Sequence, residues 1–159
     1  MNIWLADLPA ELKYYVRDVR GHNFYKGLLH CQYYAILLYV YNTTSKMSFG
    51  SEIESRQHSS WSLLYQAALM ISRIMENMVL HNEMMNCPPY IGYFIFSAMA
   101  ELVCHLKSCT RPPSEFARGA IETCIFSLEE ISKTWDQQVE FLQIFRKFLR
   151  KNVNNKQQD

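Results

Sequence analysis

Apolar residues recur at three- and four-residue steps along most of this chain, which is the spacing of one face of an α-helix. The pattern is clearest from residue 60 to residue 81. There the apolar stripe consists of Leu64, Ala67, Ala68, Ile71, Ile74, Met75 and Met78, and the polar face consists of Gln66, Arg73, Glu76 and Asn77. Alternating patterns typical of strands are scarce. The chain is therefore predicted to form an all-α bundle of about six helices, a single domain over residues 1–152 followed by a polar tail at 153–159.

Turn and capping residues divide this pattern into elements. Pro9 suits the first turn of a short helix, where its missing N–H costs nothing. The polar stretch 43–57, with a Gly and many Ser and Thr, predicts a loop. The remaining predicted boundaries are a cap at Ser59 or Ser60, a helix end near His81, a helix from Arg111-Pro112-Pro113-Ser114 to about Lys133, and a last helix near 137–151.

Two segments are apolar on nearly every side and are predicted to be buried all round. The first is 24–42, whose tyrosines suit a strand as well as a helix, although its length favours a helix. The second is 89–108, which has no charged side chain before Glu101 and is started by Pro88-Pro89. The longest uninterrupted apolar run, Tyr33–Tyr41, falls well short of the ~20 residues that span a bilayer. A membrane-spanning segment is therefore not expected.

Composition adds an expectation about partners. Hydrophobic residues make up 49% of the chain and charged residues 19%, against ~25% charged in typical soluble domains. This excess predicts an exposed apolar patch, and with it self-association or pairing with a protein partner. The net charge of +1 gives no global electrostatic case for nucleic acid. The scattered cysteines, without a secretory signal, favour a reducing compartment (Cys31, Cys87, Cys104, Cys109, Cys124).

No motif predicts catalysis. Cys104-His105-x3-Cys109 offers two ligands one helical turn apart, but no second pair completes a zinc site. His30-Cys31 with His58 lacks the signature of a cysteine nucleophile. Glu129 and Glu130 diverge on a helix and do not share a site. The chain is predicted not to be an enzyme and to hold no metal or cofactor.

Two further patterns allow more than one interpretation. The methionines concentrated in one third of the chain suit an adaptable binding surface or an irregular core, and the core is favoured (Met70, Met75, Met78, Met84, Met85, Met99). The segment "FLQIFRKFLRK" near the C-terminus is apolar on one side and basic on the other. It suits an anionic membrane surface or, by preference, a helix that closes the bundle.

Three stretches in this order, "LPAELK", "GLLHCQYYAILLYVYN" and "CPPYIGYFIFSAMA", resemble the C-terminal half of the fungal-specific transcription factor domain. This domain is the middle homology region of the binuclear zinc cluster regulators. The matching positions are Leu29, His30 and Tyr33, the paired Ala67 and Ala68, then Pro88, Pro89 and Tyr90, and last Leu128, Glu129, Ser132 and Trp135. The resemblance covers residues 5–150. Tyr90 and Trp135 are expected to be structurally important, with the ring of Trp135 buried.

The resemblance also has gaps. No Cys-x2-Cys occurs, so the zinc cluster that binds DNA in this family cannot form, and the first half of the regulatory domain is expected to be missing. Tyr41-Asn42-Thr43 stands where the family often has Arg-Pro.

The family implies a nuclear helical domain that regulates transcription through protein contacts or an apolar small-molecule effector. This chain is not expected to bind DNA directly or to enter a membrane. Two alternatives stay open: a stand-alone protein that titrates full-length regulators, and a sensor of small apolar ligands.

Overall fold

The computed structural model describes residues 3–47, 53–108 and 115–155, and every regular element within these ranges is helical. The α-helices are α1 (Ile3–Asp7), α2 (Phe24–Met47), α3 (Ile53–Leu80), α4 (Ile91–Ser108), α5 (Glu115–Ser132) and α6 (Gln138–Asn155). Two short 3₁₀ turns, η1 (Ala10–Leu12) and η2 (Met84–Asn86), complete the described elements. The all-α prediction is confirmed, and so is the choice of helix over strand for 24–42.

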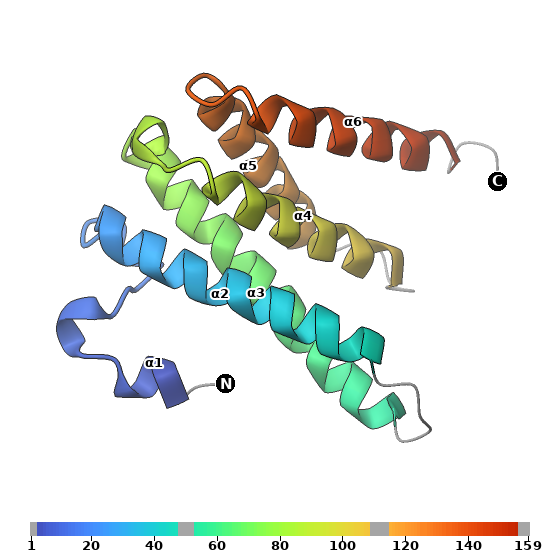
Figure 1. Ribbon diagram of the computed structural model, residues 1–159, viewed down its shortest axis with the longest axis horizontal. Helices are drawn as coiled ribbons and strands as arrows, with labels where there is room; N and C mark the ends of the chain where they lie inside the picture. The colour runs from blue at the N-terminus through green and yellow to red at the C-terminus, as the bar shows by residue number, and fades with distance from the viewer. Residues whose placement is uncertain (1–2, 48–52, 109–114, 156–159) are drawn as a thin grey trace.

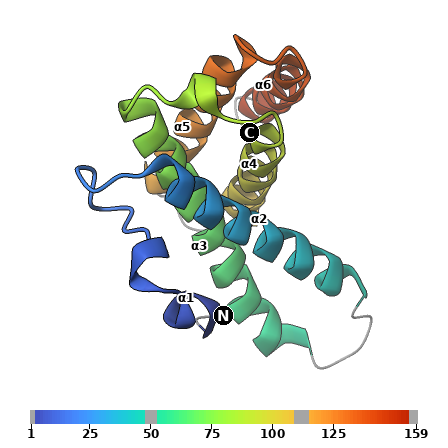
Figure 2. The ribbon, with the colours of Figure 1, turned by 60° about the vertical axis from the view of Figure 1, so that its left-hand side comes forward.

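The long helices form two layers (Figures 1 and 2). One layer holds α2, α4 and α6, which run in the same direction, and the other holds α3 and α5, which run against them. Each of the long helices α2 to α6 packs on the next along the chain, and α3 packs on α5 within its own layer. The N-terminal segment with α1 and η1 lies apart from these layers, beside α2 and α3. Within the described residues, no helix has the length and apolar character needed to cross a membrane.

Local chemistry explains where these helices start and stop. The side chain of Asn23 accepts a hydrogen bond from the Lys26 N–H at 3.1 Å, which caps the start of α2. The end of α3 is set by Asn82, whose φ of 58° turns the chain sharply. The Glu83 N–H then bonds to the Met78 carbonyl at 2.9 Å, a common way to satisfy the last turn of a helix. The predicted end near His81 is thereby confirmed.

Three predicted boundaries differ from the structure. The predicted loop at 43–57 is wrong, since α2 continues to Met47 and α3 begins at Ile53; only 48–52 lie outside the described residues. Thr43 shows why a polar residue stays helical here, because its hydroxyl donates to the Tyr39 and Val40 carbonyls at 3.0 and 2.8 Å. Ser59 and Ser60 therefore lie inside α3 and do not mark its start.

The ends of the later helices also shift. α4 begins at Ile91 rather than Pro89, because the first helical N–H groups, of Ile91 and Gly92, bond to the carbonyls of Pro88 and Pro89. α6 runs on to Asn155, past the predicted end near 151. The predicted Pro-Pro start of α5 lies outside the described residues, although α5 itself ends at Ser132 as expected.

The core lies between the layers and follows the apolar stripe of α3. Ile71, Ile74, Met75 and Met78 of this helix are fully buried. Of the clustered methionines, Met75, Met78, Met84 and Met99 are buried, Met70 is partly buried, and Met85 is exposed. The core interpretation of these methionines is therefore confirmed for four of the six.

Burial all round is wrong for both segments that were predicted to have it. Tyr25 and Tyr39 of α2 are 78% and 73% exposed, and Tyr93 of α4 is 58% exposed. An apolar sequence pattern records the lack of charge on a helix, whereas burial depends on whether another element covers each face. In the described part of the chain, one face of α2 is left uncovered.

Candidate functional site

The Pro-Pro and Trp positions of the family resemblance meet at one junction, where α4 begins and α5 turns into α6. The Trp135 indole N–H donates to the Cys87 carbonyl at 3.0 Å, and the Gln138 side-chain amide donates to the Pro89 carbonyl at 2.9 Å. The segment before α4 and the turn before α6 are thus tied together across about fifty residues of sequence.

Gly92 makes this junction sterically feasible. A Cβ at position 92 would lie 1.5 Å from the Oε1 atom of Gln138, so only glycine lets this amide enter. Gln138 is fully buried, and its Oε1 has no hydrogen-bond partner. The side chain therefore bears a desolvation cost that the bond to Pro89 offsets only in part.

Two aromatic residues at this junction are less buried than expected. Trp135 is 39% exposed and Tyr90 is 45% exposed, so the predicted burial of Trp135 is wrong. Its indole N–H is nevertheless bound to the Cys87 carbonyl. The nearby motif positions behave differently: Leu128 is fully buried, and Glu129 pairs with Arg146 of α6.

The remaining motif positions lie on α2 and α3. His30 is buried and donates its Nε2 hydrogen to the Leu12 carbonyl at 3.0 Å. Tyr33 stacks on Trp4 with ring centroids 4.4 Å apart, and Leu29 beside it is partly buried. Ala67 and Ala68 are buried in the core face of α3. These positions pack the bundle and its N-terminal segment rather than line a common cavity.

The cysteines described by the structure do not favour nucleophilic chemistry. Burial raises the pKa of the Cys87 and Cys124 thiols to about 12 and also raises the pKa of Cys31. Burial lowers the pKa of His30, whose Nε2 hydrogen is directed at a backbone carbonyl. His30 and Cys31 therefore do not form an activated pair, since a nucleophile requires the thiolate.

The metal candidate is only partly described. Cys104 is exposed on α4, His105 stacks on Tyr65 with ring centroids 3.9 Å apart, and Cys109 lies outside the described residues. The side chain of His58 is likewise not described. Among the residues that the structure places, no three His, Cys, Asp or Glu side chains gather as metal ligands would.

The clearest surface feature is the uncovered side of α2, here called the α2 face. Its exposed members share one side of the helix, since they recur at steps close to whole turns: Tyr25, Gln32, Ile36, Tyr39, Val40 and Thr43. No Asp, Glu, Lys or Arg occurs between Lys26 and Lys46. An exposed face without formal charge and with two large tyrosines is typical of a protein-binding surface.

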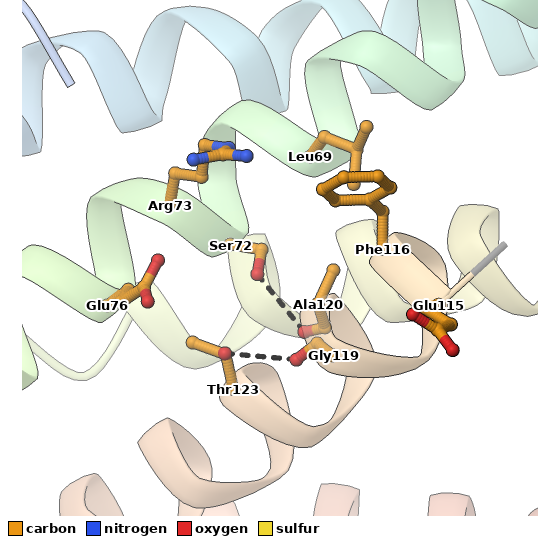
Figure 3. A pocket seen from close by; sticks show the side chains of 9 residues that line it. All are labelled: Leu69, Ser72, Arg73, Glu76, Glu115, Phe116, Gly119, Ala120 and Thr123. Atoms are coloured by element: carbon orange, nitrogen blue, oxygen red, sulfur yellow. Dashed lines mark hydrogen bonds between the residues drawn. The ribbon is translucent and has the colours of Figure 1, made fainter. Parts of the chain in front are cut away.

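A second feature is a groove between α3 and α5 on the opposite layer, here called the α3–α5 groove. Its volume is about 400 Å³. Figure 3 shows the ring of Phe116 next to Leu69, with Arg73, Glu76 and Glu115 around the opening. The lining is completed by Ser72, Gly119, Ala120 and Thr123. The helices are tied at the floor, where the Ser72 hydroxyl donates to the Ala120 carbonyl at 3.1 Å.

Sequence reasoning missed a third feature, a chain of hydrogen bonds through buried polar side chains. Asn77 was predicted on the polar face of its helix, but it is only 4% exposed and donates to the Tyr14 hydroxyl at 2.9 Å. The Tyr14 hydroxyl lies 2.7 Å from His22 Nδ1, and His22 Nε2 lies 2.6 Å from Glu83 Oε2. Nothing in the local sequence marks Asn77, which follows the charged Glu76, as buried, and its partners Tyr14 and Val16 lie more than sixty positions away.

Comparison with known proteins supports a distant relationship to a fungal transcription factor. The chain is 27% identical over 133 residues to cutinase transcription factor 1 alpha of Fusarium vanettenii. The match covers 83% of this chain and 14% of that protein, so the chain spans only a small part of its relative. No family model matches the chain, and no solved structure matches it.

Proposed function

We propose that this chain is a non-enzymatic domain that regulates transcription in the nucleus through protein contacts made by the α2 face. The observation that carries the proposal is the similarity to a fungal transcription factor over 83% of the chain. The α2 face supports the protein-contact part, because interface cores are depleted of charge and enriched in tyrosine. The apolar excess of the chain adds self-association or pairing with another regulator as the expected kind of contact.

A tethered reporter tests this function. The full chain is fused to a heterologous DNA-binding module, and transcription from its target promoter is measured in a fungal cell. We expect the fusion to change the output relative to the module alone. The double variant Ile36→Glu with Tyr39→Glu should weaken partner binding at least about tenfold, equal to about 1.4 kcal/mol, and abolish that change. A fluorescent fusion of the chain should localise to the nucleus.

The matched control is Gln137→Glu with Gln143→Glu, which adds the same charge at two exposed positions outside α2. This control should retain full activity in the reporter. A tethered chain that leaves transcription unchanged would show that the proposed function is wrong. Equal loss in both double variants would show that charge itself, rather than the α2 face, is responsible.

DNA contact by the chain itself is not part of this proposal. Of the basic residues on α6 whose side chains are described, Arg146 already pairs with Glu129, and Lys147 is exposed. A sequence-selective gel shift with the purified chain would contradict this view. A blot from the source cells separates a domain of a longer regulator from a stand-alone chain that titrates regulators, by the size of the native product.

A small apolar effector is a second candidate function, favoured by the α3–α5 groove. Its volume of about 400 Å³ is within the range of ligand pockets, and Leu69 and Phe116 provide an apolar side. A panel of sterols and apolar drugs should contain a compound that raises Tm. At a hundred times Kd the ligand contributes about 2.7 kcal/mol. Gly119→Leu should fill the groove and remove the shift, and no shift with any compound would contradict the sensor function.

A further inference from the structure

The N-terminal segment, residues 4–23, is here called the arm, and the helices and the turn after α3 bind three of its backbone carbonyls as well as several of its side chains. His30 of α2 donates to the Leu12 carbonyl at 3.0 Å, and Asn77 of α3 donates to the Val16 carbonyl at 3.0 Å. His81, just after α3, donates to the Val19 carbonyl at 2.9 Å. Side chains on the helices thus contact three carbonyls of the arm, and a carbonyl is a group that every peptide offers.

One side chain of the arm adds specificity to these backbone contacts. The Tyr14 hydroxyl accepts a hydrogen bond from Asn77, so its own hydrogen is directed to His22 Nδ1. The Nε2 hydrogen of His22 is then donated to the carboxylate of Glu83. This order satisfies every member of the chain, and Tyr14 is only 8% exposed. Asn77 and Glu83 therefore bind the linked side chains of Tyr14 and His22, in addition to the carbonyls of the arm.

Apart from Tyr14 and Val16, which reach the hydrophobic core, the arm packs little on the long helices. α1 and η1 are short, no residue of η1 is buried, and neither packs broadly on a long helix. Trp4, at the far end, stacks on Tyr33 but remains 38% exposed. A segment held by side-chain hydrogen bonds and a few rings resembles a bound peptide more than a part of the bundle.

We propose that α2, α3 and the turn after α3 form a peptide-binding site, which the chain fills with its own arm and which accepts the arm of a second copy. Exchange of an identical element between copies needs no new contacts, because the contacts already seen within one copy are reused between two. This inference does not rest on the proposed role in transcription.

Because the arm is covalently joined to its own binding site, the exchange must be tested with variants that weaken either the arm or the site. An arm joined to its own site by a short link competes at an effective concentration in the millimolar range, so a free peptide is excluded from the intact chain. Tyr14→Ala weakens the arm but leaves the site intact. Asn77→Ala damages the site but leaves the arm intact. Each full-length variant lacks one half of the interaction, and a mixture contains both halves.

The first experiment measures anisotropy of a labelled peptide of residues 8–23. We expect the Tyr14→Ala chain to bind it at least tenfold more tightly than the wild-type chain. Adding Asn77→Ala to that chain should return binding to the wild-type level, and a peptide with Tyr14→Ala should not bind. Trp4→Ala, which removes the stack on Tyr33 and the edge contact with His30, serves as the arm-weakened chain if Tyr14→Ala loses its helical circular dichroism.

The second experiment mixes the Tyr14→Ala and Asn77→Ala chains and measures their mass by sedimentation. The mixture should form a heterodimer at concentrations where each variant alone is a monomer, because the intact arm of one fills the intact site of the other. Peptide binding that survives Asn77→Ala would overturn the proposal. So would equal binding to the wild-type and arm-weakened chains, or a mixture that sediments like its separate components.

Discussion

α2 and α3 pack against each other, but they present chemically different surfaces to solvent. The α2 face has no formal charge over a long stretch and exposes Tyr25 and Tyr39. The outward side of α3 exposes Arg73 and Glu76 at the rim of the α3–α5 groove. Both helices turn aliphatic residues inward. The inner sides of both helices are therefore explained by packing in the core, and the two helices differ only in their outer sides.

This difference indicates where a partner would act. A solvated helix face normally carries charges, because they keep it soluble and favour the monomer. α3 follows that rule and α2 does not. The uncharged face of α2 is hence better suited to burial against another protein than to permanent contact with water.

The largest effects should come from the inner sides, and they should be equal in the two helices. Leu38→Ala in α2 and Ile71→Ala in α3 each remove a fully buried side chain and should cost about 2–5 kcal/mol of unfolding free energy. Urea denaturation measures the loss. The outward controls Ile36→Ala and Arg73→Ala should stay within about 0.5 kcal/mol. A loss above that from Ile36→Ala would mean that the α2 face serves the fold.

Effects of intermediate size on stability are expected when each of two helical glycines is replaced by alanine, and the two effects should have opposite signs. Gly92→Ala would push against Gln138 and should cost about 1–3 kcal/mol, the usual range for overpacking. Gly119 lines the α3–α5 groove, and a Cβ there meets nothing within 4 Å. Gly119→Ala should therefore stabilise α5 by about 0.5–1 kcal/mol. Thermal denaturation of both variants measures the contrast, and equal changes in Tm would contradict it.

The smallest effect concerns pH and the inner side of α2. Burial lowers the pKa of His30, so between the folded value and about 6.5 the unfolded chain binds more protons than the folded one. The stability from neutral His30 is thus fully present above about pH 6.5 and is lost as pH falls. Unfolding free energies at pH 7.5 and pH 5 should differ less in His30→Gln than in the wild type. An unchanged difference would contradict this assignment.

How far sequence reasoning reached depended on whether a feature was local. The amphipathic stripe of α3, the stop near His81 and the Pro-Pro boundary before α4 were predicted, because spacing and proline chemistry act within a turn or two. The Ser- and Thr-rich stretch 43–57 was wrongly predicted to be a loop, and the reason is again local. Hydroxyls that favour turns can also bond back to their own helix, as Thr43 does.

The candidate surfaces depended on contacts between distant residues. Sequence reasoning predicted an exposed apolar patch from composition but assigned the segment that carries it to the buried core. It placed Asn77 in solvent, although this residue anchors the arm from more than sixty positions away. Trp135 was expected inside, and its place in the turn before α6 leaves it partly open.

The sequence by itself determined that this protein is helical, where its core stripe lies and that it has more apolar surface than a small bundle can hide. These properties follow from periodicity and composition, which can be read from neighbouring residues without knowing which distant residues come into contact. Only the tertiary structure decided which face of α2 stays uncovered, that Gln138 needs Gly92, and that Tyr14 meets Asn77. Those outcomes depend on which elements come into contact, because a side chain is buried or paired only by what lies against it.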